Sequence, residues 1–94
     1  MITSKDCKMA IVELCKLSRA HIESQFVPGT TGNPLTDKEF AETGRVANWK
    51  RITKEKYSDG SIERGFDCHP FDDQLRGYVV EKNGCIVSVR IQGE

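Results

Sequence analysis

The sequence lacks a net charge, a long hydrophobic run and any closely spaced pair of cysteines. Its 94 residues include 14 Lys plus Arg and 14 Asp plus Glu, so the formal net charge is zero. A dedicated nucleic-acid-binding protein is usually clearly basic, so this balance disfavours that class and equally disfavours an acidic mimic of DNA. A local patch of either sign remains compatible with the composition.

No segment approaches the roughly 20 apolar residues that a membrane-spanning helix needs. The polar residues at the N-terminus do not resemble a secretory signal. The cysteines form no C-x-x-C pair and are Cys7, Cys15, Cys68 and Cys85. We therefore expect a cytoplasmic protein with free thiols, no disulfide framework, no cofactor and no contact with a membrane.

Aromatic residues make up only 7% of the sequence, and it contains only 3 prolines. The apolar fraction of 37% and charged fraction of 30% are typical of a slightly polar globular protein rather than a disordered chain. The length predicts a single domain, residues 1–94, with one core and little stability to spare.

The N-terminal region has the periodicity of an amphipathic helix, which we predict from Lys5 to Phe26. At about 100° per residue, one stripe collects the apolar and small side chains, and most of the charged ones fall elsewhere. The stripe contains Cys7, Ile11, Leu14, Cys15, Ser18, Ile22 and Phe26. Thr3 or Ser4 can cap this helix, and Asp6 sits in its first turn, where the helix dipole favours negative charge. Met9 lies far from the stripe and is expected to be exposed.

A loop and a short second helix follow the first helix. Glycines and prolines between Val27 and Leu35 break the helical pattern and predict the loop. Thr36 followed by Glu39 is a capping-box sequence, so a short helix is predicted to begin at Asp37 and to end at Gly44.

Asp59-Gly60 has the sequence of a two-residue turn and predicts a hairpin between strands Trp49–Tyr57 and Ser61–Cys68. The pairs expected on one face are Tyr57–Ile62, Glu55–Arg64, Thr53–Phe66 and Arg51–Cys68. Those expected on the other face are Lys56–Glu63 and Ile52–Asp67. Opposite charges then meet across the strands, as cross-strand pairing favours.

Asn83-Gly84 between alternating apolar residues predicts a second hairpin, Arg76–Lys82 with Cys85–Gln92. One face is expected to carry Tyr78, Val80, Cys85, Val87, Val89 and Ile91. The other is expected to carry Val79, Glu81, Ile86, Ser88 and Arg90. The elements together predict an α+β fold, in which a long N-terminal helix packs on a four-stranded antiparallel sheet of two hairpins, with a short second helix. Val79 and Ile86 are predicted to lie on the sheet face away from the long helix.

A basic stretch runs along the first predicted strand and contains Lys50, Arg51, Lys54 and Lys56, between Trp49 and Tyr57. Aromatic and cationic side chains on a sheet are typical of single-stranded nucleic-acid platforms, where bases stack and phosphates meet lysines. The predicted register places the aromatic side chains and the lysines on opposite faces, with acidic residues across from the lysines. A solvated face, or an edge strand guarded by lysines, is therefore the main interpretation.

The densest group of reactive side chains runs from Asp67 to Asp73, between the two hairpins. Cys68 and His69 are weak candidates for a metal site, because adjacent strand residues rarely reach one ion and tetrahedral sites normally use spaced ligands. They also form a poor nucleophile–base pair, because neighbouring strand side chains point to opposite faces. The structural alternative is a strand end followed by a turn, which Pro70 begins and which Asp72 or Asp73 caps.

The remaining reactive side chains are interpreted as structural. Cys7 and Cys15 in the helix stripe, and Cys85 on the apolar strand face, are expected to be core residues. His21 lies on the flank of the stripe and is expected to be partly buried. No catalytic residue is assigned.

The leading functional hypothesis is a small non-enzymatic protein-interaction module, of the size and composition of accessory proteins from bacteria and phages. Its expected contacts are Met9, Val79 and Ile86, with a protein partner or a second copy of the chain. Nucleic-acid binding through Lys50–Lys56 is the alternative, with Trp49 among its candidate binding residues. A small-molecule or metal site around Asp67–Asp73 is the second alternative.

Overall fold

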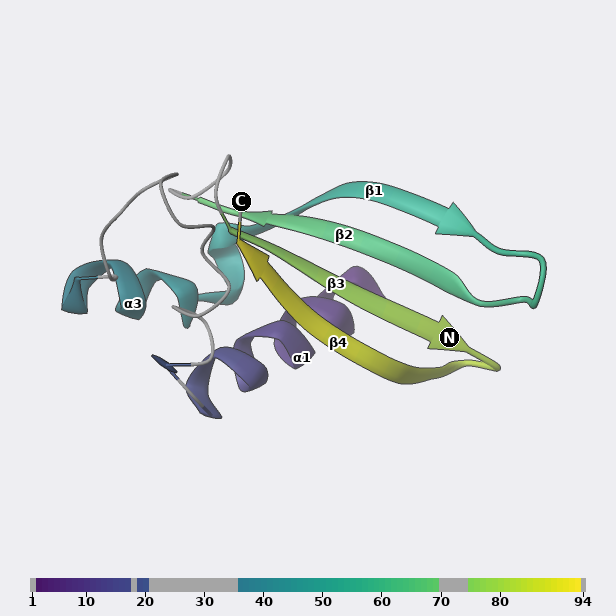
Figure 1. Ribbon diagram of the computed structural model, residues 1–94, viewed down its shortest axis with the longest axis horizontal. Helices are drawn as coiled ribbons and strands as arrows, with labels where there is room; N and C mark the ends of the chain where they lie inside the picture. The colour runs from purple at the N-terminus through teal and green to yellow at the C-terminus, as the bar shows by residue number, and fades with distance from the viewer. Residues whose placement is uncertain (1, 18, 21–35, 70–74, 94) are drawn as a thin grey trace.

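The computed structural model describes residues 2–17, 19–20, 36–69 and 75–93 (Figure 1). It has the predicted α+β architecture. The helical elements are α1 (Ser4–Leu17), α3 (Asp37–Thr43) and the short 3₁₀-helix η1 (Val46–Asn48). The strands are β1 (Trp49–Lys56), β2 (Ile62–Cys68), β3 (Leu75–Lys82) and β4 (Cys85–Gly93), and they form one antiparallel sheet in the order β1-β2-β3-β4.

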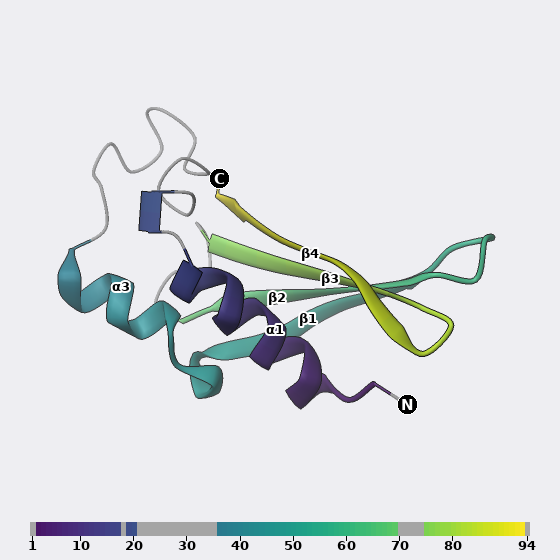
Figure 2. The ribbon, with the colours of Figure 1, turned by 90° about the horizontal axis from the view of Figure 1, so that it is seen from below.

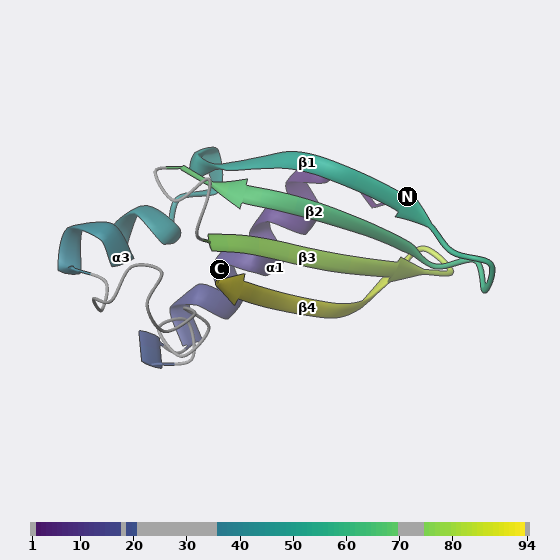
Figure 3. The same ribbon diagram turned by 45° about the horizontal axis from the view of Figure 1, so that its top comes forward.

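Helix α1 lies across one face of the sheet, and its strand contacts are mainly with β3 and β4 (Figures 2 and 3). Helix α3 lies beyond the end of the sheet at which β1 begins. The predicted loop at 27–35, the predicted helical segment at 21–26, and residues 70–73 lie outside the described residues. Among the described residues, no helix is both long and apolar enough to cross a membrane.

The predicted N-terminal caps of both helices are confirmed. The hydroxyl of Thr3 accepts from the Asp6 N–H at 3.2 Å, and the Asp6 carboxylate accepts from the Thr3 N–H at 2.9 Å. These hydrogen bonds lower the pKa of Asp6. Thr36 and Glu39 form the complete capping box of α3, at 3.1 Å in each direction.

The β1–β2 hairpin forms, but the predicted two-residue turn and its register are wrong. The turn has three residues, Ser58, Asp59 and Gly60. The Tyr57 N–H donates to the Ser61 carbonyl oxygen at 2.9 Å, and Gly60 takes the left-handed conformation with φ of 89°. Asp59 stabilises the longer turn, since its carboxylate accepts from the Ser61 N–H at 2.9 Å and from the Ser61 hydroxyl at 2.6 Å.

The extra turn residue changes every predicted pair near the tip. The observed pairs are Lys56–Ile62, Glu55–Glu63, Lys54–Arg64 and Thr53–Gly65. A bulge at Ile52 then shifts the register again, so Arg51 pairs with Phe66 and Trp49 with Cys68. Since Phe66 and Arg64 are two residues apart on β2, Arg51 and Lys54 lie on the same face of the sheet, which is the face that α1 covers in part.

The β3–β4 turn is confirmed, with positive φ at Asn83 (55°) and Gly84 (77°). The predicted pairs next to it, Lys82–Cys85 and Glu81–Ile86, also form. Beyond them a bulge at Val87 shifts the register, so Val79 pairs with Val89 and Tyr78 with Arg90. The predicted pairs Tyr78–Val89 and Val80–Val87 are therefore wrong. The predicted apolar face is divided between the two sides of the sheet.

The core lies between α1 and the faces of β2, β3 and β4. Its fully buried side chains come from every layer: Cys7, Ile11, Val12, Cys15, Trp49, Phe66, Cys68, Leu75, Val79 and Ile91. The helix packs directly on the β3 backbone at Gly77, where an added Cβ would lie 2.8 Å from Ile11 Cδ1. A side chain at this position would push α1 away from the sheet.

Val79 and Ile86 do not lie on the outer face, so their predicted placement is wrong. Val79 is 0% exposed in the core, and Ile86 is half-buried against it. The cause is the bulge at Val87, which leaves Val87 itself 59% exposed. Met9, at 49% exposed, lies on the surface as predicted.

Candidate functional site

The four cations of β1 are exposed and form a row along one edge of the sheet. Lys50, Arg51, Lys54 and Lys56 belong to a strand whose only buried residue is Trp49. We call these four residues the basic edge. Within the described part of the chain, none of the four takes part in an ion pair or a side-chain hydrogen bond.

The arginines of the other strands are all paired with carboxylates. Arg64 meets Glu81 at 2.5 Å, Arg76 meets Asp67 at 3.3 Å, and Arg90 meets Glu63 at 3.4 Å. The first pair is nearly buried, with side chains 9% and 12% exposed, and it lies beside the Cys7 thiol beneath α1. In the part of the chain that the structure describes, the arginines of β2, β3 and β4 are therefore neutralised, whereas the cations of β1 are not.

The observed register also removes acidic neighbours that the sequence predicted for the lysines. Lys54 lies opposite Arg64 and Lys56 opposite Ile62, whereas Glu63 lies opposite Glu55. Lys50 lies opposite Asp67, but that carboxylate is already paired with Arg76. The expected neutralisation of the basic strand across the hairpin is thus not found.

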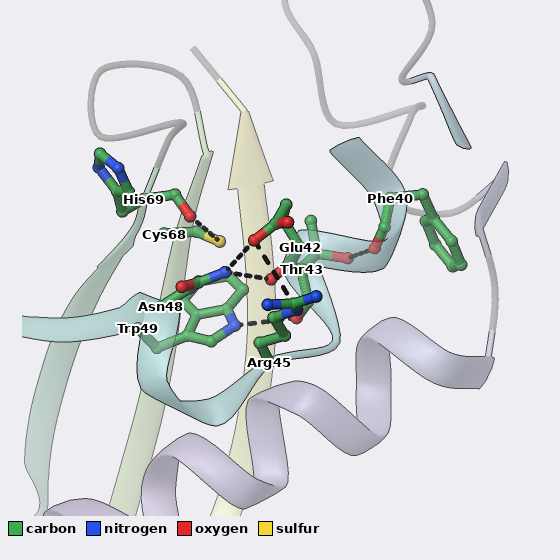
Figure 4. A network of polar contacts seen from close by, with 8 residues as sticks. All are labelled: Phe40, Glu42, Thr43, Arg45, Asn48, Trp49, Cys68 and His69. Carbon is green, nitrogen blue, oxygen red and sulfur yellow. Dashed lines mark hydrogen bonds and ion pairs between the residues drawn. The ribbon is translucent and has the colours of Figure 1, made fainter. Parts of the chain in front are cut away.

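Trp49 does not belong to this surface, so its prediction as a binding residue is wrong. Its side chain is 0% exposed, and its indole N–H donates to the Thr43 carbonyl oxygen at 3.0 Å. It anchors the start of β1 to the end of α3 (Figure 4). Tyr57, at 44% exposed, remains as an accessible aromatic ring on this hairpin.

The sheet face away from α1 carries a network of polar contacts between strands. The Tyr57 hydroxyl lies 3.1 Å from a carboxylate oxygen of Glu55 and 3.3 Å from one of Glu63. The hydrogen bond to Glu55 is the main cause that raises the pKa of Tyr57. Glu63 pairs with Arg90, whose guanidinium lies over the Tyr78 ring at 4.5 Å. This network holds the two glutamates, which face each other, on the side opposite Lys54 and Lys56.

Cys68 and His69 stand at the end of β2, as predicted, but they do not form a reactive pair. Cys68 is buried, with its sulfur 3.7 Å from the His69 carbonyl oxygen, whereas the His69 side chain is exposed. Figure 4 shows the imidazole ring pointing away from that sulfur. Within the ranges described, no group of three or more His, Cys, Asp or Glu side chains could hold a metal ion. The remaining candidates here, Asp72 and Asp73, lie outside those ranges, as does His21.

A set of hydrogen bonds fixes the start of β1 at the same end of the sheet. The Asn48 amide donates to the Glu42 carbonyl oxygen at 2.9 Å and to its carboxylate at 2.7 Å. The Asn48 carbonyl oxygen accepts from the His69 N–H at 2.8 Å. Figure 4 shows the two contacts of the Asn48 amide with Glu42, which join η1 to α3. The backbone bond from His69 joins η1 to the end of β2. These hydrogen bonds position β1 and have a structural role.

The two cysteines of α1 and Cys85 are free thiols in two kinds of environment. Cys7 and Cys15 are buried, as predicted. Burial raises the pKa of Cys7, and it raises the pKa of Cys15 to about 12. Cys85 is exposed next to the β3–β4 turn, so its prediction as a core residue is wrong. The buried thiols are held in their neutral form, which suits packing rather than nucleophilic attack.

No protein-family model, no curated protein and no solved structure matches this chain at a significant level. The candidate site therefore rests on the geometry of the described residues. The basic edge was present in the sequence prediction, but its lack of neutralisation was not. The signal that could have revealed it is Ser58-Asp59-Gly60-Ser61, which also fits a three-residue turn with glycine in the left-handed position.

Proposed function

We propose that this domain is a non-enzymatic binding module that recognises an acidic protein partner through the basic edge. The observation that supports it is the contrast in charge pairing. Within the described residues, four cations are exposed and unpaired on one edge strand, while the arginines of β2, β3 and β4 are paired with carboxylates. Unpaired cations on one strand attract an acidic partner and accelerate its association, even though the net charge of the domain is zero.

The position of β1 supports the same surface. Strand β1 is at the edge of the sheet, and α1 packs mainly against the opposite half. An exposed apolar side chain, Ile52 at 42%, accompanies the cations on this strand. Tyr57, at 44% exposed, lies on the other face of the same hairpin beside Glu55 and Glu63. Apolar contact area beside charged groups is a common combination in protein interfaces.

A direct test measures binding of the protein to poly-L-glutamate by fluorescence anisotropy at physiological salt. The triple variant Arg51→Glu, Lys54→Glu, Lys56→Glu should bind at least about tenfold more weakly than the wild type, because attraction becomes repulsion. Lys38→Glu is the matched control, since Lys38 is also exposed and unpaired in the described residues but lies on α3. Equal affinity of the triple variant and the wild type would show that the basic edge is not the contact surface.

A nucleic acid is the second candidate partner, and the observed pairing of β1 with β2 favours it. Lys56, which was expected to face Glu63, faces Ile62 instead, and Lys54 faces Arg64, so both ammonium groups are available to phosphates. The buried Trp49 counts against it, since the indole cannot stack on a base. Binding of a single-stranded oligonucleotide that falls steeply with salt, with a log–log slope of about −3 for four contacts, would support this candidate.

A further inference from the structure

The hydrogen-bonding groups of β1 identify which residues face its free side. The Tyr57 N–H donates to the Ser61 carbonyl oxygen across the hairpin. In an antiparallel pair, alternate residues direct their N–H and C=O groups to the same neighbouring strand. The register is regular between Thr53 and Tyr57, so Thr53 and Glu55 point their backbone groups toward β2. The backbone groups of Lys54 and Lys56 therefore point away from it.

Nothing in the described part of the chain pairs with these outward groups, because β1 is the first strand of the sheet and β2 is its one neighbour. The free side thus offers two N–H donors and two C=O acceptors, from residues two positions apart. The bulge at Ile52 ends this regular edge on one side and the turn after Tyr57 ends it on the other. The available edge accommodates a short extended segment of about five residues.

The side chains of the same two lysines give this edge its specificity. Lys54 and Lys56 lie on one face of the sheet, because strand residues two apart share a face. Glu55 lies on the other face, beside Glu63 and Tyr57. A strand placed opposite Lys54 and Lys56 would therefore have its own alternate side chains next to two ammonium groups.

A second copy of this chain does not fit the same edge. Antiparallel pairing of two β1 strands around Glu55 would place Lys54 of one copy opposite Lys56 of the other. Like charges directly across a pair of strands are destabilising. Lysines on an exposed edge are a known device against such pairing between copies. The free edge of β1 can therefore pair with a strand of another protein, whereas pairing with β1 of a second copy is unfavourable.

We propose that β1 binds an extended peptide segment with carboxylates two residues apart, which joins the sheet as a fifth strand opposite Lys54 and Lys56. The inference rests on the proposed function and names the conformation and charge pattern of the partner. Backbone hydrogen bonds supply the affinity of strand addition, and alternate side chains supply its specificity. The two carboxylates would each meet one lysine, and the residue between them would lie on the face of Glu55.

The first test compares three labelled heptapeptides by fluorescence anisotropy. The probe is Ser-Thr-Glu-Thr-Glu-Thr-Ser, in which both glutamates fall on one face. The first comparison peptide, Ser-Thr-Thr-Glu-Glu-Thr-Ser, has the same composition with its glutamates on opposite faces. The second is the probe with N-methylated glutamates, which cannot donate to the carbonyls of Lys54 and Lys56. We expect the probe to bind at least about tenfold more tightly than either comparison peptide.

The second test measures amide hydrogen exchange in the protein. Saturating probe peptide should slow exchange of the Lys54 and Lys56 amides, which face the free side, while the Tyr57 amide already donates within the hairpin. The double variant Lys54→Glu, Lys56→Glu should bind the probe at least about tenfold more weakly, and Lys38→Glu should bind it like the wild type.

Each contrary outcome has a separate meaning. Equal binding of the three peptides, or no binding of the probe at millimolar concentration, overturns strand addition, while the poly-L-glutamate result still decides the proposed function. If Lys54→Glu, Lys56→Glu binds the probe as the wild type does, β1 is not the site. If an oligonucleotide binds more tightly than the probe and the double variant abolishes that binding, the partner class is a nucleic acid and the inference is wrong.

Discussion

The two edge strands of this sheet differ in what they bury and in how their charges are balanced. Strand β4 contacts α1, buries Ile91 and pairs its Arg90 with Glu63. Strand β1 buries Trp49 and exposes every residue after it, with no ion pair at its four cations among the described residues. Helix α1 packs mainly against β3 and β4, so β1 is left as an exposed edge whose side chains after Trp49 add nothing to the core.

The largest expected effect on stability is a difference between the residue at the start of β1 and the residue at the tip of its hairpin. Trp49→Ala should destabilise the protein by about 3–5 kcal/mol, because it empties a buried site and removes the hydrogen bond to Thr43. Tyr57→Ala should cost less than about 1 kcal/mol, because that ring is 44% exposed. Urea denaturation of both variants measures the difference. Similar costs would mean that the tip of the hairpin is as much part of the core as its base.

The next effect contrasts the paired and unpaired charges. Glu81→Leu should cost about 3 kcal/mol, because it leaves the nearly buried Arg64 without its carboxylate. The double variant Arg64→Met, Glu81→Leu should recover most of that loss, since it leaves no unpaired charge under α1. Thermal or urea unfolding of the single and double variants provides the measurement, and a double variant no more stable than Glu81→Leu would contradict the account.

The next prediction concerns Cys15, which is buried between α1 and the sheet, and the pH dependence of the free energy of unfolding. Its folded pKa of about 12 lies above the ordinary 9.0 of a thiol, so the unfolded chain loses this proton first. The stabilising contribution is complete below pH 9 and is lost as the pH rises toward 12, by about 1 kcal/mol per pH unit. The gap in unfolding free energy between wild type and Cys15→Ala should therefore narrow between pH 9 and 10. A constant gap would show that this thiol titrates normally in the fold.

The smallest expected effect is on the stability of the basic edge. Lys54→Gln and Lys56→Gln should each change the unfolding free energy by less than about 0.5 kcal/mol, because neither side chain is buried or paired in the described structure. Removing either charge should even stabilise the protein slightly, since it relieves repulsion along the strand. A loss above about 1 kcal/mol in urea denaturation would assign these lysines a structural role.

Much of the architecture was predictable because it depends on short sequence signals. The capping box at Thr36 and Glu39, the Thr3 cap and the Asn83-Gly84 turn involve residues a few positions apart, and each formed as predicted. The candidate site was only half predictable. Its cations were visible in the sequence, but their freedom from acidic neighbours depends on a turn that is one residue longer than expected.

The main error of the sequence prediction was the assignment of strand side chains to the two faces of the sheet, and this error has a physical reason. Side chains alternate with a period of two, so one additional residue in a turn or a bulge transfers all the following side chains to the other face. The bulges at Ile52 and Val87 have no glycine or other local signal in the sequence. The bulge at Val87 brings Val89 and Ile91 to the same face as Val79, and the bulge at Ile52 brings Trp49 to the face of Phe66 and Cys68.

Local sequence was therefore enough to specify the helices, the strands and their antiparallel connection. The packing of α1 against Gly77 and its neighbours selected which residues became the interior, and in doing so it left Lys54 and Lys56 on an uncovered edge. Burial of apolar area is a property of the whole assembly of elements, so it can override the register that any single turn prefers.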